Sequence, residues 1–403
     1  MRGCDQRPNM ELRHYQAESV RRAVEFFKSN DKTRPVLVAP TGSGKSVMIA
    51  YIAKELEGNI LVLQPSAELA QQNFSKYETV TKNNGFEPPA FFSASIGIKE
   101  RAKVTFATIG SIYRRPDEFQ DVRFVIIDEC HTVPPVCDSM YMQFLGQLNV
   151  KVIGLTATPY RLKTYTNPFN KREKFSKINL LNRERPNFFN RFLHIIQIQD
   201  LYAEGFLCPI NYVELTWDGK LLKSNATGAE YTEESMKRAI DDNGIARNVP
   251  AIVKQAFEKG RKACVVFTRS VEEAAQMSSV TPHSAYLFAE MPKPERRAII
   301  EAFKGGGIKT VFNVGILQIG FDFPELDTIV VARPTMSLAL FSQMVGRGMR
   351  LANGKDHCTV VDMCGNLERF GKPEHIELLN DEKEGWILRN DGKTISGVRL
   401  DEL

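Results

Sequence analysis

Short apolar runs alternate along the chain with longer stretches in which apolar residues recur every three or four positions. Continuous apolar runs are typical of strands buried on both faces of a parallel sheet, and the periodic stretches are typical of amphipathic helices. The pattern predicts strands at residues 36–39, 60–63, 104–107, 124–127, 152–155, 263–267, 310–314, 328–332 and 358–362. It predicts helices at residues 47–56, 233–258, 294–303 and 338–345.

This alternation predicts an α/β fold with two tandem domains, each built on a mainly parallel sheet. Strand signals fade in residues 162–208, so we place the join between the domains there. We expect a first domain at residues 1–195 and a second at residues 196–380. Residues 381–403 are expected to form a short hairpin or tail, because Asp391 and Gly392 stand between two apolar runs.

Composition excludes several classes of protein. The 403 residues are 43% hydrophobic and 25% charged, as in ordinary globular proteins. No run approaches the roughly 18 apolar residues of a membrane-spanning helix, and the N-terminus lacks the apolar core of a secretory signal. We therefore expect a cytoplasmic protein without a membrane partner. The net charge of +5 is compatible with a polyanionic partner but does not require one.

The seven cysteines include no C-x-x-C pair, so a zinc module is not predicted. We expect reduced, buried thiols that pack as small apolar side chains.

Residues 39–46, with the sequence APTGSGKS, lie between a predicted buried strand and a predicted helix. Gly42 and Gly44 allow backbone N–H groups to turn toward phosphate oxygens, and a helix N-terminus adds partial positive charge. Lys45 would reach the β- and γ-phosphates, and the Ser46 hydroxyl would complete the shell of Mg²⁺. The alternative is a glycine turn with an incidental lysine, which the strand–loop–helix order disfavours. The predicted nucleotide contacts are Thr41, Gly42, Ser43, Gly44, Lys45 and Ser46.

Two acids, Asp128 and Glu129, directly follow the predicted strand at 124–127. An acid at the carboxyl end of a buried parallel strand points into the crevice where ligands bind. Asp128 would hold Mg²⁺, and Glu129 would orient and deprotonate the attacking water. Taken alone, such acids are often a solvated strand end, but a phosphate loop in the same domain favours catalysis.

With these motifs the chain resembles superfamily 2 helicases of the DExH type, whose naming box corresponds to residues 128–131, DECH. The resemblance covers roughly residues 12–366 in family order. Within the superfamily, residues 154–162, 315–324 and 345–352 resemble RadD-like and phage UvsW-like DNA helicases. RadD-like proteins continue into a cysteine-rich tail that has no counterpart after Asn366. The resemblance implies two RecA-like domains with the ATP site in the cleft between them, and ATP and Mg²⁺ as cofactors.

The resemblance also assigns roles to individual residues. Arg13 and Gln16 belong to an element that reads adenine. Backbone contacts to nucleic acid would come from Pro65, Ser66, Thr108, Thr268, Arg269 and Asn313. Gly320 and Asp322 would face the nucleotide, and Gln343, Arg347 and Arg350 would face the triphosphate. His131 would link the hydrolysis site to this last motif, although a buried structural histidine is a fair alternative.

Arg347 and Arg350 are three residues apart, so we expect them on one face of a helix. An arginine delivered to a triphosphate contributes ~10³–10⁵ in rate, because it stabilises charge that spreads over the phosphate oxygens. The alternative is a solvated basic helix end.

Residues 161–200 combine nine Lys or Arg residues and three acids with interleaved aromatic residues. Basic residues would contact phosphates, and aromatic rings would stack on bases. An interdomain loop whose aromatic residues pack into a domain base is an equally good interpretation.

These observations predict an ATP-dependent helicase or translocase that acts on branched or single-stranded DNA in replication, recombination or repair. DNA is favoured over RNA by the resemblance alone, and we expect a monomer. The alternatives are a duplex translocase that does not separate strands, an RNA-directed helicase, and a nucleotide-gated clamp that recruits partners.

Overall fold

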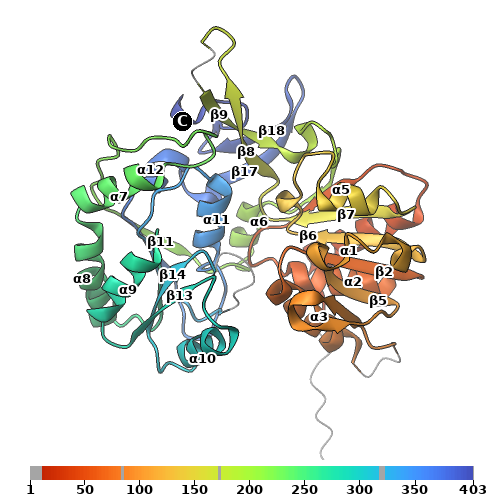
Figure 1. Ribbon diagram of the computed structural model, residues 1–403, viewed down its shortest axis with the longest axis horizontal. Coiled ribbons are helices and arrows are strands. Elements are labelled where there is room, and N and C mark those ends of the chain that lie inside the picture. The colour runs from red at the N-terminus through yellow and green to blue at the C-terminus, as the bar shows by residue number, and fades with distance from the viewer. Residues whose placement is uncertain (1–10, 83–85, 171–173, 317–322, 403) are drawn as a thin grey trace, which may run out of the picture. The chain divides into compact units, whose positions relative to one another are not determined.

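The computed structural model describes residues 11–82, 86–170, 174–316 and 323–402. The chain forms two compact units (Figure 1). Unit 1 comprises residues 1–159 and 181–196, and unit 2 comprises residues 160–180 and 197–403. Residues 160–180, which we expected in the first domain, and residues 381–403, which we expected as a separate tail, thus group with the second unit.

Unit 1 is built on a sheet with the strand order β10-β1-β7-β6-β2-β5-β3-β4, parallel except for the β3–β4 pair. Its strands are β1 (Pro35–Val38), β2 (Asn59–Gln64), β3 (Ala90–Ser93), β4 (Ile98–Lys99), β5 (Val104–Thr108), β6 (Val122–Asp128), β7 (Lys151–Thr156) and β10 (Arg191–Ile195). Its helices are α1 (His14–Lys28), α2 (Lys45–Glu55), α3 (Ala67–Thr81), α4 (Ile109–Ile112) and α5 (Met140–Leu145).

Unit 2 contains a second sheet, which is parallel throughout and has the order β11-β16-β15-β12-β14-β13. Its strands are β11 (Ile210–Glu214), β12 (Cys264–Phe267), β13 (Ser284–Phe288), β14 (Thr310–Val314), β15 (Thr328–Val331) and β16 (Cys358–Asp362). Its helices are α6 (Ile198–Ala203), α7 (Glu233–Asp242), α8 (Ile245–Glu258), α9 (Val271–Ser279), α10 (Lys293–Lys304), α11 (Leu338–Gly346) and α12 (Asn366–Phe370). The two mainly parallel sheets confirm the predicted fold class.

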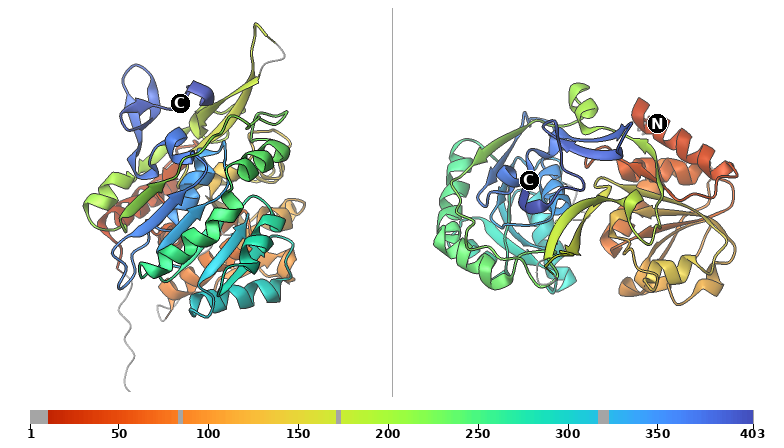
Figure 2. Two further views of the ribbon diagram at one scale, coloured as in Figure 1. Left: turned by 90° about the vertical axis from the view of Figure 1, so that its left-hand side faces the viewer. Right: turned by 90° about the horizontal axis from the view of Figure 1, so that it is seen from above.

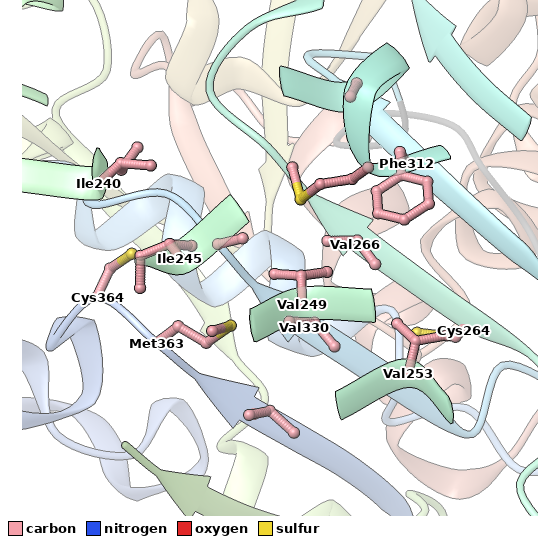
Figure 3. Close-up of a cluster of buried hydrophobic side chains, with 14 residues drawn as sticks. Ile240, Ile245, Val249, Val253, Cys264, Val266, Phe312, Val330, Met363 and Cys364 are labelled. Carbon is pink, nitrogen blue, oxygen red and sulfur yellow. The ribbon is translucent and has the colours of Figure 1, made fainter. Parts of the chain in front are cut away.

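A cluster of buried side chains joins α8 to the second sheet. Val249 and Val253 of α8 pack against Cys264, Val266 and Val330 of the central strands (Figure 3). All five are nearly or fully buried, and burying one valine contributes about 1.5–3 kcal/mol. This core holds the central strands of unit 2 and so fixes where their carboxyl ends lie.

Unit 2 also carries two antiparallel elements that the hydrophobic pattern did not reveal in full. Strands β8 (Tyr160–Thr166) and β9 (Lys174–Leu180) pair as a hairpin that projects from the sheet (Figures 1 and 2). Strands β17 (Ile376–Asp381), β18 (Gly385–Asn390) and β19 (Lys393–Thr394) form the predicted C-terminal hairpin and one further pair. Strand signals fade in residues 162–208 because most of the hairpin's side chains are only partly buried and many are polar.

Every other predicted helix and strand is present, although one predicted helix is divided into two. The described cysteines are buried as predicted, with one exception. The stretch at 233–258 divides into α7 and α8 at Gly244, whose φ of 62° stops the first helix. Five described cysteines are buried as expected, but Cys137 is exposed, and Cys4 lies outside the described residues. No helix in the described part of the chain has the length and apolar character of a membrane span.

Candidate functional site

The glycine loop of unit 1 adopts a conformation that requires glycine. Gly42 and Gly44 have φ values of 88° and 85°, which side-chain-bearing residues rarely adopt. A Cβ atom on Gly44 would also lie 2.5 Å from Nε2 of Gln16. Helix α2 begins directly after the loop at Lys45 and has Gly44 as its N-cap. The loop therefore places a helix N-terminus and its backbone N–H groups where an anion would bind.

Side chains at the N-terminal end of α1 form hydrogen bonds with the backbone of this loop. Gln16 is buried, and its Nε2 donates to the Ser43 carbonyl at 2.8 Å. The Tyr15 hydroxyl donates to the same carbonyl at 3.2 Å. The Gln16 Oε1 accepts from the backbone N–H of Arg13 at 3.0 Å. The amide nitrogen of Gln16 thus keeps one further hydrogen and the amide oxygen one further lone pair, so adenine recognition by Arg13 and Gln16 stays a prediction.

Asp128 ends strand β6 and is 1% exposed. Its Oδ2 accepts from Nδ2 of Asn73 at 2.7 Å, and its Oδ1 accepts from the Glu129 backbone N–H at 2.9 Å. Burial and, to a lesser extent, the neighbouring Glu129 raise the pKa of Asp128 to about 6, although Lys45 and the Asn73 hydrogen bond act to lower it. A buried carboxylate with unused lone pairs is suited to a cation.

Glu129 stands beside the phosphate loop and has a left-handed backbone conformation, with a φ of 46°. Its Oε1 lies 3.5 Å from Nζ of Lys45, and its Oε2 lies 3.4 Å from Nδ1 of His131. Strain of this kind costs about 1–3 kcal/mol and often occurs at functional sites. The arrangement brings the side chains of the two motifs close together within unit 1.

Within unit 1, His131 contacts the end of strand β7, and its expected link to the motif at residues 343–350 stays a prediction. Its Nδ1 lies 2.8 Å from the Thr156 Oγ1, and the same oxygen accepts from the Thr158 backbone N–H at 3.0 Å. Thr156 ends strand β7, and its carbonyl accepts from the Ala39 N–H at the start of the phosphate loop. His131 therefore connects the acidic end of β6 to the end of β7, within the same sheet.

The donor set fits Mg²⁺ held jointly with a nucleotide. Among the described residues, no three His, Cys, Asp or Glu side chains gather into a metal site. Mg²⁺ is usually bound by one or two protein groups together with substrate phosphates, so the absence of an all-protein cage is expected. Ser46 at the start of α2 and Asp128 are the residues that would hold it.

The predicted nucleic-acid contacts of unit 1 lie at the carboxyl ends of strands β2 and β5. Ser66 follows Pro65 and caps α3, because its hydroxyl accepts from the Leu69 N–H at 3.2 Å. Thr108 is the last residue of β5, and its hydroxyl oxygen lies 2.8 Å from the hydroxyl oxygen of Ser111.

The residues of unit 2 that we expected to contact nucleic acid form hydrogen bonds and ion pairs with other residues of unit 2. Thr268 and Asn313 are each 1% exposed, and the Thr268 N–H and hydroxyl both donate to the Asn313 carbonyl. Arg269 forms ion pairs with Glu233 at 2.9 Å and with Glu273 at 2.6 Å. In this conformation these side chains offer little surface to a strand, so their predicted contacts stay predictions.

The structure corrects the expected placement of the two arginines. Helix α11 ends at Gly346, Arg347 is its C-cap, and Arg350 lies beyond the helix. The two therefore do not share a helical face. Gln343 and Arg347 are each 8% exposed. Gly320 and Asp322 lie outside the described residues.

Sequence reasoning missed two residues that hold functional segments. Asn73 on α3 donates to Asp128, yet nothing in the pattern of an amphipathic helix distinguishes it. The Lys355 ammonium donates to the carbonyls of Gly348 and Arg350 at 2.8 Å each and of Pro324 at 3.0 Å. Desolvation by burial lowers the pKa of Lys355. Lys355 thus fixes the backbone that carries Arg350, a role only the tertiary structure shows.

The aromatic residues of 161–200 divide between the two interpretations. Phe188, Phe189 and Phe192 are buried, as the packing interpretation predicts. Phe169, between β8 and β9, is 97% exposed, and Tyr165 stacks on Phe175 across the hairpin. Lys171 and Arg172, two of its basic residues, lie outside the described residues.

Two family descriptions match the chain. Residues 9–161 match the family described as "Type III restriction enzyme, res subunit". Residues 248–352 match the "Helicase conserved C-terminal domain". The first match contains the glycine loop and the acids of unit 1, and the second contains the central strands and α11 of unit 2.

Several similar proteins carry helicase or translocase names. The chain is 25% identical to the candidate ATP-dependent helicase IRC3 of Saccharomyces cerevisiae, over 88% of this chain and 51% of that protein. It is 26% identical to a 51.5 kDa protein of a Lactococcus phage, over 89% of this chain and 72% of that protein. It is 23% identical to the DNA 3'-5' translocase XPB2 of Sulfurisphaera tokodaii, over 85% of this chain and 79% of that protein. The chain thus spans about half the length of the first of these relatives.

Solved structures share the fold. The restriction-modification enzyme LlaBIII bound to DNA superposes with a TM-score of 0.62 at 18% identity, over 89% of this chain and 28% of that one. Saccharomyces cerevisiae Dbp5 bound to RNA and ADP BeF3 gives a TM-score of 0.56 at 13% identity, over 87% of this chain and 83% of that one. Both comparisons match the predicted architecture of two RecA-like domains.

Proposed function

We propose that the chain is a superfamily 2 helicase, an ATP-driven motor of the DExH type that unwinds or moves along DNA. The observation that carries the proposal is the meeting of Lys45, Asp128 and Glu129 beside a glycine loop in unit 1. Phosphoryl transfer needs a positioned phosphate chain, a metal-binding acid and a base for water, and this site supplies a residue for each.

In the proposed mechanism, the loop N–H groups and Lys45 hold the phosphates, and Ser46 and Asp128 hold Mg²⁺. The metal, when bound, neutralises charge on the phosphate oxygens. Glu129 orients the attacking water and accepts its proton. Lys45 lies within 3.5 Å of Glu129 in this structure, so the lysine stabilises the ionised carboxylate that a base requires.

We further propose that Gln343, Arg347 and Arg350 of unit 2 complete the charge stabilisation when ATP is bound. Arg347 caps α11, and the Arg350 backbone is anchored by Lys355. A segment held in this way presents its side chains in a defined direction. Gly320 and Asp322 belong to the same proposal through the resemblance alone.

DNA is the proposed substrate, with replication, recombination or repair as the setting. The resemblance to RadD-like and UvsW-like DNA helicases supports this choice. The DNA translocase among the similar proteins and the DNA-bound structural neighbour also support it. An RNA-directed motor is the second candidate, because a structural neighbour is bound to RNA.

The test is ATP hydrolysis measured with single-stranded DNA, duplex DNA, forked DNA, Holliday junctions and single-stranded RNA, with Lys45→Ala as the inactive control. We expect at least tenfold stimulation by one of the DNA substrates and none in the control. Stimulation by RNA alone would replace DNA as the substrate. Strand displacement beside triplex displacement then separates a helicase from a duplex translocase.

A further inference from the structure

We propose that a pocket within unit 2 binds one unstacked nucleotide of a single nucleic-acid strand. The inference rests on the proposed function and adds to it a contact outside the helicase motifs. The pocket has a volume of about 710 Å³. Pockets of about 300–1,000 Å³ hold small organic ligands, so a nucleotide fits.

Strand β9, the segment at 217–231 and the segment that begins α12 form most of this pocket, and Met336 and Leu400 complete its lining. Gly365 at its wall comes three residues after Asp362, the end of strand β16. Ligands of parallel sheets bind beyond the carboxyl ends of the strands, and the pocket occupies this position in the second sheet.

The pocket wall contains a tryptophan that is held in place from two sides. Trp217 packs against the core of unit 2. A Cβ atom on Gly365 would lie 2.8 Å from Cδ1 of Trp217, and a Cβ atom on Gly219 would lie 2.9 Å from its Nε1. Glycines at both positions let the backbone approach the indole edge. The ring is therefore ordered before any ligand arrives, which lowers the entropic cost of stacking a base on it.

Cations stand among the aromatic residues of the pocket. Lys174, Lys220 and Arg369 line it together with Phe175, Trp217 and Tyr231. Arg369 lies 5.1 Å from the centre of the Tyr231 ring, so these two side chains form one wall. Lys220 is largely exposed and pairs only weakly with Asp218, at 3.2 Å. A strand phosphate would compete for Lys220 at little cost, because exposed ion pairs are worth about 0–1 kcal/mol.

The combination of ring and cation selects a nucleotide over an apolar or purely anionic ligand. Bases of single strands stack on aromatic side chains while basic residues follow the phosphates. Asp218 and Glu368 also line the pocket, and carboxylates accept hydrogen bonds from base amino groups. Arg269, which the helicase motif assigns to the strand, is instead engaged by two glutamates. The pocket would give unit 2 a different contact with the nucleic-acid strand.

The first measurement uses tryptophan fluorescence. The chain has two tryptophans, Trp217 and Trp386, so Trp386→Phe leaves Trp217 as the only reporter. Titration with oligo-dT and oligo-U should quench this emission, because base stacking quenches indole. The ratio of the two affinities tells DNA from RNA. An oligonucleotide that binds, as seen by its own label, without changing Trp217 emission would overturn the proposal.

The second measurement uses variants. Trp217→Ala should weaken single-strand binding by about fivefold or more, and Trp217→Phe by less, because a phenyl ring still stacks. Lys220→Ala should lower the slope of log affinity against log salt by about 0.7, the value for one phosphate contact on a single strand. Lys237→Ala is the matched control, since Lys237 is an exposed lysine paired with Asp241 outside the pocket.

The outcomes separate this inference from the proposed function. If nucleic acid stimulates ATP hydrolysis but the Lys220→Ala and Lys237→Ala variants share the wild-type affinity and salt slope, the pocket is not a strand contact and the motor stands. If no nucleic acid binds or stimulates, the proposed function and this inference both fall. Because Lys220 is exposed, its substitution tests the pocket even where Trp217→Ala does not fold.

Discussion

Two buried aspartates each end a parallel strand, one in each large sheet, and differ in what surrounds them. Asp128 ends β6 of unit 1, Asp362 ends β16 of unit 2, and they are 1% and 2% exposed. Burial raises the pKa of both carboxyls. Position and burial alone therefore do not distinguish a catalytic acid from a structural one.

The hydrogen bonds make the distinction. Asp362 accepts from the Cys364 N–H, the Asn366 side chain and the Leu367 N–H, at 2.6–3.1 Å, and so closes the turn into α12. Asp128 accepts from Asn73 and from the Glu129 N–H. A carboxylate has about four lone-pair sites, so Asp128 retains more capacity for a metal. The second sheet uses its acid to build a loop, whereas in the proposed mechanism the acid of the first sheet would hold Mg²⁺.

The largest expected effect concerns the proposed contribution of unit 2 to hydrolysis. Arg347→Ala should lower kcat by about 10³ while ATP still binds, because the arginine acts on charge that develops in the transition state. Single-turnover hydrolysis beside ATP binding measures both. A loss of less than tenfold would confine the chemistry to unit 1 and reject the proposed role of Arg347.

A paired substitution of the two aspartates tests the comparison itself. Asp128→Asn should lower kcat by about 10² or more, since it removes the charge that would hold Mg²⁺. Asp362→Asn should instead lower the free energy of unfolding by about 1–3 kcal/mol, because its amide nitrogen cannot accept from the turn. Equal effects of the two substitutions on kcat, measured on folded protein, would contradict the assignment.

The pH dependence follows from the raised pKa of Asp128. Hydrolysis needs the ionised carboxylate, so kcat/KM should fall about tenfold per pH unit below about pH 6. The folded state holds the proton more tightly than the unfolded state, so this group's contribution to stability is complete below about pH 4 and is lost as the pH rises through about 6.

Comparing Asp128→Asn with wild type isolates that contribution. The variant should gain about 2 kcal/mol in unfolding free energy relative to wild type between pH 4 and pH 7. Denaturant unfolding at the two pH values measures it, and a difference that does not change with pH would show that Asp128 ionises normally.

The smallest expected effect concerns Lys355, which anchors the backbone of Arg350. Lys355→Met should lower kcat by about tenfold and leave KM for ATP unchanged, because the arginine segment loses its fixed position while the phosphate loop is untouched. Lys355→Arg should restore part of the rate. Lys254→Met, on the exposed face of α8, is the matched control.

The fold was largely predictable because parallel strands buried on both faces are written as continuous apolar runs. The phosphate loop and the acids were predictable because their chemistry fixes residue type and spacing. The β8–β9 hairpin was not, since most of its side chains are only partly buried and carry no such run. Asn73 and Lys355 act through contacts between distant segments, which a single sequence does not record. The end of α11 before Arg347 depends on a local turn that helical spacing does not reveal.

The most direct test of the account is Glu129→Gln, studied by ATP binding and single-turnover hydrolysis with and without DNA. Glutamine keeps the shape of the side chain but cannot take a proton from water. We expect wild-type affinity for ATP and a hydrolysis rate reduced by about 10²–10⁴. Hydrolysis at the wild-type rate would show that Glu129 is not the base and that the chemistry of this site lies elsewhere.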